Sequence, residues 1–373
     1  TRIDAAISSL LLPCTLQRRP RESARYAPFL DFILVLNKIN FLLGQTMKLI
    51  SYRDPVDSTL VRTGLVLPGE VHFVDLLVGY EQLDSELPAP ELAQMQTLIE
   101  AGEPALAKIR KIEQWARQNP EQRNALANVA LCSPLPVPVK FRAFSVYEKH
   151  LLQAIDSVVR NRIGPIAYRA NKIFKFIKPP KQFYQAPIYY KGSNTSFIGA
   201  GDEVIPPTFG EPMLDYECEL GVVIGKRGMD IAEEQAMDHV FGYTIFNDVS
   251  ARKRLIPEFR GVTGPLKGKD FHTGNIMGPW IVTRDEIPDP SALELRVSVN
   301  GDLKGVGHAA DMHYNIAQMI AFASEGEPVV AGEFFGTGAP GDCTGIEHWE
   351  FLNSGDVMTL EIDGIGSLEN KVG

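Results

Sequence analysis

The stretch DYECELGVVIG, residues 215–225, combines two closely spaced glutamates with a strand-like apolar run. Side chains two positions apart on a strand point to one face, so Glu217 and Glu219 lie side by side and Cys218 points away as a small buried residue. The apolar run after them predicts a buried strand. Like charges are costly to bury unless neutralised, so the pair indicates a cation site, with a solvated strand face as the alternative.

A third carboxylate follows at the end of the next predicted strand, in GYTIFNDVSAR at residues 242–252. Asp248 closes the apolar part of this segment and could meet the two glutamates at one edge of the sheet. Three carboxylates form an oxygen-only cage that suits a hard divalent cation. The alternative for Asp248 is the N-cap of a helix that starts just after it, because aspartate is a favoured capping residue.

The composition is that of an ordinary globular chain without an electrostatic footprint for nucleic acid. Its 373 residues are 45% hydrophobic and 22% charged, with a formal net charge of -9. No dense run of lysine and arginine occurs, so we expect a small-molecule ligand and no nucleic-acid partner. The four cysteines are widely spaced without a zinc-ligand pattern, which favours a reduced, intracellular protein.

The first 46 residues are richer in arginine and poorer in acids than the rest of the chain. Their apolar stretch is interrupted by polar residues, so it does not predict a membrane span. Three interpretations stay open: an organelle transit segment, a gene-model or cloning extension, and an ordinary amphipathic arm. We expect a cytoplasmic protein without a membrane partner, or a mitochondrial one if residues 1–46 are a transit segment.

Sequence patterns divide the remaining chain into a small N-terminal α+β domain, residues 47–132, and a larger domain, residues 133–373. Short alternating runs predict an antiparallel sheet in the first, followed by helices at Pro90–Glu100 and Pro104–Gln118. The proline-rich segment at 133–138 predicts an extended linker. The second is sheet-dominated, and its apolar runs predict a roll or barrel-like sandwich covered on both sides. Its predicted helices are Tyr147–Arg162, Ile231–Val240 and Met312–Ser324.

Four further motifs follow the two acidic segments: KGKDF at 267–271, GTG at 336–338, LNSGDV at 352–357 and GIGSLEN at 364–370. Together the motifs closely resemble the fumarylacetoacetate hydrolase (FAH) family over roughly residues 135–373. The resemblance implies an FAH-type mixed β-roll in the larger domain, and a homodimer. It also implies that the bound cation is Mg2+, Mn2+ or Ca2+ and that its ligands are Glu217, Glu219 and Asp248.

The same resemblance gives active-site roles to six further residues. Lys269 matches a lysine beside the developing oxyanion, where a fixed positive charge in a dry site stabilises an enolate. His150 falls where the family places a histidine that activates water. Glu347 matches the glutamate that orients this histidine, and Glu148 is the other candidate for that role. The remaining three match residues that line the substrate pocket: Arg252, Tyr190 and Thr337.

Two departures separate the chain from well-known members of that family. A fourth metal-binding aspartate of some members, seven residues before the histidine, is Ala143 here. Other members have a His-x-x-Glu dyad, whereas Gln153 stands at the glutamate position of this chain. The missing aspartate argues against fumarylacetoacetate itself as the substrate.

The sequence therefore predicts a metal-dependent hydrolase that cleaves a carbon-carbon bond in an acylpyruvate or a fumarylacetoacetate-like diketo acid, through an enolate held by the metal. A second enzymatic hypothesis retains the metal and changes the reaction to oxaloacetate decarboxylation or tautomerisation, or to isomerisation or hydration in aromatic catabolism. A third hypothesis is a binding or scaffold module. The intact set of ligands argues against it.

Overall fold

The computed structural model describes residues 47–83, 88–210, 212–259, 261 and 264–373. Residues 1–46 lie outside this part of the chain, so the prediction of a transit-like extension falls on residues whose structure is not described. Within the described ranges, no helix is long and apolar enough to cross a membrane.

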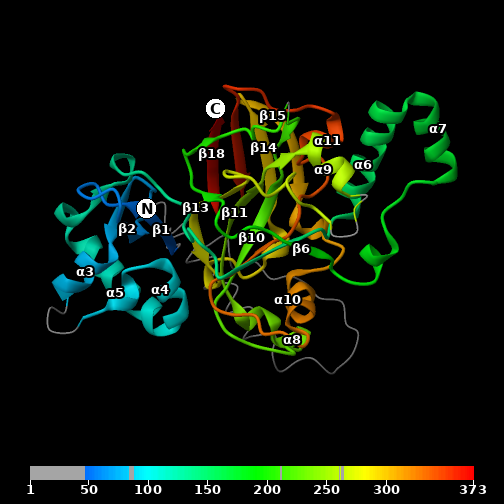
Figure 1. Cartoon of the computed structure of the whole chain (residues 1–373). Coiled ribbons are helices and arrows are strands. Elements are labelled where there is room, and N and C mark those ends of the chain that lie inside the picture. The colour runs from blue at the N-terminus through cyan, green and yellow to red at the C-terminus, as the bar shows by residue number, and fades with distance from the viewer. Residues whose placement is uncertain (1–46, 84–87, 211, 260, 262–263) are drawn as a thin grey trace, which may run out of the picture. The chain divides into compact units, whose positions relative to one another are not determined.

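The larger of two main sheets draws its strands from both predicted domains (Figure 1). Its strands are β1 (Lys48–Arg53), β2 (Val61–Val66), β3 (His72–Asp75), β4 (Asn124–Ala125), β5 (Lys140–Phe144), β6 (Tyr189–Lys191), β7 (Phe197–Ile198), β10 (Cys218–Ile224), β11 (Val240–Asp248), β13 (Asn275–Thr283) and β16 (Glu333–Gly336). They pair in the order β4-β3-β2-β1-β13-β11-β10-β16-β5-β6, and β7 pairs with β13. The central strands β10, β11 and β13 are buried along their whole length, as their apolar sequences predict.

A second sheet packs against one face of these central strands. Its order is β15 (Asp302–His308), β14 (Glu294–Val299), β17 (Val357–Ile362), β18 (Gly366–Val372) and β8 (Glu203–Val204). Buried positions alternate with partly exposed ones along β14 and β17, because only one face of this sheet meets the core. A short two-stranded sheet joins β9 (Leu214–Asp215) to β12 (Ser250–Ala251).

Helices cover the other face of the larger sheet. They are α3 (Leu76–Leu83), α4 (Met95–Ala101) and α5 (Glu103–Gln118). Ile109 and Ile112 on the buried side of α5 share a hydrophobic cluster with Phe246, Ile281 and Phe334 of the central strands. The sheet is therefore covered on both sides, which confirms the prediction of a sheet-dominated α+β fold of roll type, without a closed barrel among the described strands.

The predicted domain boundary at residue 133 does not interrupt the larger sheet. Strand β1 pairs antiparallel with β13, and Leu49 lies opposite Ile281. Residues 47–132 thus extend the sheet of the following segment, and do not form the separate small sheet that the alternating runs predict. The division into two domains stays a prediction.

The helices after β5 differ from prediction at their ends. They are α6 (Glu148–Val158), a π-helical turn η4 (Val159–Ile163), α7 (Pro165–Phe174), α8 (Glu233–Ala236), α9 (Arg252–Glu258), α10 (Ile316–Ser324) and α11 (Gly345–His348). Helix α10 begins later than predicted because Asn315 forms a capping box with Gln318. Helix α7 was not predicted, since Gly164-Pro165 indicates a helix end, whereas Pro165 occupies the first helical position, where proline is favoured.

Short 3-10 turns complete the described structure. They are η1 (Pro90–Leu92), η2 (Pro120–Gln122), η3 (Leu126–Asn128), η5 (Lys181–Tyr184), η6 (Met237–His239), η7 (Arg284–Glu286), η8 (Pro290–Ala292) and η9 (Ala309–Asp311). The predicted helix at Ile231–Val240 is replaced by α8 and η6, because strand β11 already begins at Val240.

Candidate metal centre and active site

The three predicted carboxylates converge where β10 begins and β11 ends. Glu219 lies in β10, Glu217 precedes it, and Asp248 is the last residue of β11, the antiparallel partner of β10. One carboxylate oxygen from each residue lies within 4.8 Å of the others, and all three residues are buried. The structure therefore brings together the residues that the sequence predicts as metal ligands.

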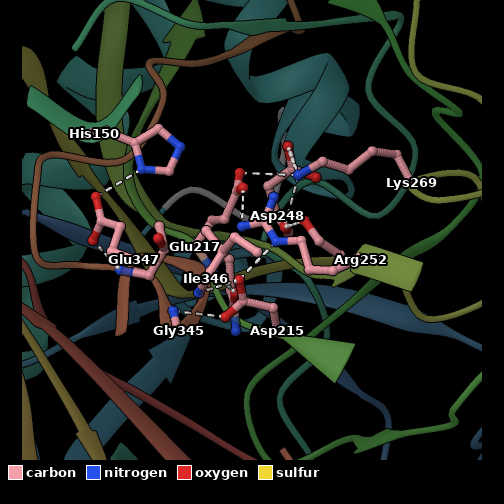
Figure 2. A network of polar contacts seen from close by, with 12 residues as sticks. His150, Asp215, Glu217, Asp248, Arg252, Lys269, Gly345, Ile346 and Glu347 are labelled. Carbon is pink, nitrogen blue, oxygen red and sulfur yellow. Dashed lines mark hydrogen bonds and ion pairs between the residues drawn. The ribbon is translucent and has the colours of Figure 1, made fainter. Parts of the chain in front are cut away.

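Two buried cations also lie at this cluster. Lys269 Nζ lies 2.9 Å from Glu217 Oε2 and 2.8 Å from Asp248 Oδ2 (Figure 2). The Arg252 guanidinium pairs with Glu217 Oε1 at 2.5 Å and with Asp215 Oδ2 at 2.7 Å. With Asp215 counted, four buried carboxylates face two buried cations, which leaves two negative charges without a counterion. A divalent cation matches this deficit and the all-oxygen donor set.

The pKa values of the three clustered carboxylates reflect the same shortage of positive charge. Burial, together with the charges of Asp248 and Glu217, raises the pKa of Glu219 well above its usual range. Burial also raises the pKa of Asp248 to about 6, although Lys269 opposes this shift. For Glu217, burial acts in the same upward direction, but Lys269, Arg252 and His150 together lower its pKa to about 2. Glu217 is thus held as an anion, while the other two carboxylates lack enough positive charge.

Backbone groups of the GTG motif fix the position of Glu219. The Gly338 N-H donates to Glu219 Oε2 at 2.8 Å. A Cβ atom at Gly336 would lie 2.6 Å from the same oxygen, so glycine is needed there for the carboxylate to fit. This contact explains why the motif accompanies the Glu-x-Glu pair in the sequence.

Asp248 does not act as a helix cap. The N-cap residue of α9 is Ala251, and no side chain caps that helix end. Instead, the Tyr190 hydroxyl donates to Asp248 Oδ2 at 2.8 Å, and Lys269 pairs with the same carboxylate. The capping alternative for Asp248 is therefore wrong.

We expect added Mn2+ to stabilise the protein more strongly as pH rises. A carboxyl with a raised pKa in the folded state binds its proton more tightly there than in the unfolded chain, so it stabilises the fold when protonated. Deprotonation of Asp248 should therefore lower the stability of the metal-free protein as pH rises from about 4 to about 6. Deprotonation of Glu219, whose pKa is also raised, should lower this stability as well. A bound cation replaces these protons and removes the loss. Thermal unfolding in EDTA and in Mn2+ across this range provides the test, and a stabilisation by Mn2+ independent of pH would contradict it.

His150 and Glu347 form a hydrogen-bonded pair between α6 and α11. His150 Nδ1 lies 2.8 Å from Glu347 Oε1, and the Glu347 side chain is fully buried (Figure 2). Glu347 Oε2 also accepts from the Thr344 N-H in a capping box at the start of α11, which fixes its orientation. Glu148, the other candidate partner, accepts from the Tyr184 hydroxyl. The geometry favours Glu347 as the residue that orients His150.

Asp215 is a site residue to which the sequence gave no role. Its Oδ1 accepts from the Gly345 N-H at 2.7 Å, and its Oδ2 from the Ile346 N-H at 3.0 Å, at the start of the helix that carries Glu347. Oδ2 also accepts from Arg252 Nε at 2.7 Å. This carboxylate therefore joins the helix of Glu347 to the arginine that holds Glu217. The sequence could have indicated this role, because Asp215 is a third acid in the stretch 215–219 and a buried acid needs a hydrogen-bonding or charged partner.

The predicted pocket residues contact protein groups. Arg252 is buried and its guanidinium binds Asp215 and Glu217, so in this structure it positions carboxylates of the chain. Tyr190 binds Asp248, and the fully buried Thr337 donates to the Gly338 carbonyl oxygen at 3.3 Å. Their roles in substrate binding stay predictions.

The structure shows what surrounds Ala143 and Gln153, the two positions at which the chain departs from the family pattern. Ala143 lies in β5 directly opposite Tyr190 in β6, so the position of the absent fourth aspartate adjoins a residue that reaches Asp248. Gln153 Nε2 donates to Asp342 Oδ1 at 2.5 Å, and Lys149 Nζ pairs with Asp342 Oδ2 at 2.7 Å. These contacts hold α6 against the loop before α11, which keeps His150 near Glu347.

Comparison with known families agrees with this site. Residues 166–373 match the family model described as fumarylacetoacetate (FAA) hydrolase C-terminal. The chain belongs to the fumarylacetoacetate hydrolase family. The segment that matches the FAH-family model begins at residue 166 and contains the three carboxylates of the candidate metal site. His150 on α6 lies before this segment.

Proteins and solved structures that are similar to this FAH-family protein include several enzymes. It is 32% identical to oxaloacetate tautomerase YisK of Bacillus subtilis, with 81% of this chain and 96% of the relative covered. It is 31% identical to the mitochondrial oxaloacetate tautomerase fahd2 of Xenopus laevis, over 88% and 90% of the two chains. Maleylpyruvate hydrolase from Sphingobium sp. SYK-6, in complex with manganese(II) and pyruvate, has a similar fold with a TM-score of 0.62, 25% identity, and coverage of 87% and 98%. The FAH-family protein is therefore an enzyme of a group that contains both hydrolases and tautomerases.

Proposed function

We propose that this FAH-family enzyme uses a divalent cation to interconvert the keto and enol forms of oxaloacetate or a closely related 2-oxo dicarboxylate. The observation that supports this reaction best is the His150–Glu347 pair near Glu217 of the carboxylate cluster, which supplies a proton-transfer group next to a site for a chelating substrate (Figure 2). Two relatives that share most of the chain's length are named oxaloacetate tautomerases. The proposal thus ranks tautomerisation above the carbon-carbon hydrolysis that the sequence alone favoured.

Keto-enol exchange moves one proton between a carbon and the neighbouring carbonyl oxygen. With its Nδ1-H donated to Glu347, His150 has Nε2 free to accept a proton from the carbon and return it to the oxygen. Mg2+ or Mn2+ held by Glu217, Glu219 and Asp248 would supply Lewis acidity that makes this carbon more acidic. Tautomerisation moves a proton within the substrate and hydrolyses no bond, so it consumes no water molecule.

Lys269 contributes a fixed positive charge to the same site. Burial opposes its ionisation, but Asp248 and Glu217 raise the pKa of Lys269 above its ordinary value. It therefore remains an ammonium group and acts through its charge, stabilising the enolate oxygen electrostatically. In Figure 2, His150 and Lys269 approach Glu217 from different directions, which leaves the proton-transfer group and the charge on separate sides of that carboxylate.

The direct experiment follows the ultraviolet absorbance of enol-oxaloacetate after the enzyme is added with Mg2+ or Mn2+. We expect the enol to disappear faster than in buffer with the same metal, and EDTA to abolish the acceleration. Product analysis separates the alternatives, since decarboxylation yields CO2 and pyruvate. Oxaloacetate that tautomerises at the uncatalysed rate would contradict the proposal.

Hydrolysis of a carbon-carbon bond in an acylpyruvate is the second candidate. One observation favours it: the His150 side chain retains 13% exposure, so a water molecule can reach the base that the family uses to activate water. A similar fold belongs to a maleylpyruvate hydrolase. A panel of acylpyruvates and other diketo acids, assayed with Mg2+ and with Mn2+, separates the two candidates, because only hydrolysis releases pyruvate and a second carboxylic acid.

We expect Lys269→Met to lower kcat by at least about 100-fold, since the variant removes the charge that faces the enolate. It should also destabilise the metal-free protein, because Glu217 and Asp248 lose an ion-pair partner. Lys267→Met is the matched control, since Lys267 is an exposed lysine two residues away. Equal rates for the two variants would exclude an electrostatic role for Lys269.

A further inference from the structure

A long segment after α6 has an unusual charge for this acidic protein. Residues 157–201 contain neither aspartate nor glutamate, although the chain has 46 acidic residues and a net charge of -9. We call residues 159–184 the basic arm; it comprises η4, α7 and the chain through η5. Its basic residues are all exposed: Arg160, Arg162, Arg169, Lys172, Lys175, Lys178 and Lys181.

Helix α7 of the basic arm has an apolar face without a packing partner among the described residues. Ile166 and Ile173 lie on one side of the helix, seven positions apart, and are 82% and 73% exposed. The opposite side carries the buried Asn171, and α7 packs against α6 and η4. Figure 1 shows α7 out beyond α6, away from the two sheets. The exposed isoleucines therefore face away from the rest of the domain.

The turn after α7 continues this apolar surface. Phe174 and Phe176 stack on each other with ring centroids 5.3 Å apart, and both are more than half exposed. Asn171 clamps the turn, since its Oδ1 accepts from the Ile177 N-H at 2.7 Å and its Nδ2 donates to the Ile177 carbonyl oxygen at 3.1 Å. The aromatic pair is thus held outward by a defined hydrogen-bonded turn.

Several cations of the basic arm have no acidic partner within the described part of the chain. Lys172 pairs with Asp156, but no ion pair involves Arg169, Lys175, Lys178 or Lys181 there. These free charges alternate with the exposed isoleucines and phenylalanines along the same segment. Positive charge and apolar surface are therefore presented together.

We infer that the basic arm docks on the surface of a bilayer that contains anionic lipids. Basic amphipathic helices with exposed aromatic residues bind in the interfacial region, where lysines meet lipid phosphates and the apolar face enters the acyl boundary. Clusters of four to eight basic residues on such helices are typical of anionic-lipid binding. Here Arg169 and Lys172 lie on α7, and three further lysines follow it within seven residues. Protein interfaces, in contrast, are depleted in lysine, which makes a second copy of this chain the weaker fit.

The inference revises the sequence-based expectation that no membrane is a partner. That expectation followed from the lack of a membrane-spanning segment, and within the described residues no helix could span a membrane. The basic residues are spread over 22 positions, and the fold gathers them with the apolar side chains on one arm. Binding would be peripheral, and it does not depend on the proposed reaction.

The test is co-flotation of the full chain with phosphatidylcholine vesicles, prepared with and without phosphatidylglycerol. We expect binding only to the anionic vesicles and a marked loss at high salt, because salt screens the lysines. Lys175→Glu, Lys178→Glu and Lys181→Glu combined should weaken vesicle binding by about 100-fold or more. Phe174→Ser with Phe176→Ser should weaken it at both salt concentrations, since the apolar contribution is not screened.

A matched control reverses three exposed lysines outside the basic arm, with Lys111→Glu, Lys226→Glu and Lys371→Glu combined. This variant has the same net charge as the arm variant and should retain vesicle binding. Thermal unfolding and light scattering on every variant check folding and oligomeric state. Equal binding by the arm and control variants would overturn the inference. So would a change of oligomeric state in the arm variants without any vesicle binding by the wild type, which would identify the arm as a subunit interface.

Discussion

His150→Ala should lower kcat for the preferred substrate by about 100- to 10,000-fold, the range expected when a general acid-base group is removed. The affinity for Mn2+ should change little, because His150 is not one of the three clustered carboxylates. Steady-state kinetics with calorimetric titration of Mn2+ measures both quantities. The combination of lost turnover and retained metal distinguishes a catalytic base from a structural residue.

The neighbouring glutamates supply a matched pair of controls for this prediction. Glu347→Gln removes the charge that holds His150 Nδ1 and should lower kcat and shift its pH profile. Glu148→Gln alters a carboxylate on the same helix that contacts Tyr184, so it should leave both nearly unchanged. If Glu148→Gln were the more damaging change, the assignment of Glu347 as the orienting residue would be wrong.

Glu219→Gln should weaken Mn2+ binding by at least about 100-fold and abolish measurable activity. Loss of even an outer hydrogen-bond partner of a metal site typically costs about 10- to 100-fold in affinity, and loss of a ligand costs more. The same change should leave the metal-free protein equally stable or make it more stable, because Glu219 is a buried carboxyl beside two like charges. The amide retains an oxygen for the Gly338 N-H and fits a similar volume.

Glu219→Gln should thus abolish activity without lowering the stability of the metal-free protein, and this combination is what the experiment must show. Thermal unfolding in EDTA and calorimetry with Mn2+ measure the two terms separately. Glu121→Gln is a suitable control, since Glu121 is an exposed glutamate on η2 and should affect neither. A large loss of stability in EDTA for Glu219→Gln would mean that Glu219 stabilises the fold without a cation, which contradicts the proposed metal site.

The three clustered carboxylates could be predicted from the sequence because they lie on two strands that are neighbours along the chain. The spacing of Glu217 and Glu219 is fixed by strand geometry, and Asp248 ends the neighbouring strand, so simple pairing brings them together. His150 and Glu347 lie 197 positions apart, and only the family resemblance joined them before the structure did. Long-range pairs of this kind carry no signal in local sequence patterns.

Other features could not be predicted because they depend on contacts made by the fold. Asp215 acquires its role when the start of α11 packs against it, and the sequence does not indicate which acid meets which helix end. Helix α7 was missed because a glycine-proline pair can end one helix and start another. The reaction itself is also undetermined by the residues alone, since a metal-stabilised enolate serves hydrolases and tautomerases equally.

The pairing of β1 with β13 has a practical consequence for attempts to shorten the protein. Residues 47–132 supply strand β1, which pairs with the Ile281–Val282 end of β13, a strand that is buried along its length. A truncated chain that begins at residue 133 would leave those backbone N-H and C=O groups unpaired beside exposed isoleucine and valine. Such an uncovered strand is a template for intermolecular pairing, so the fragment should aggregate even though it retains every residue of the candidate active site.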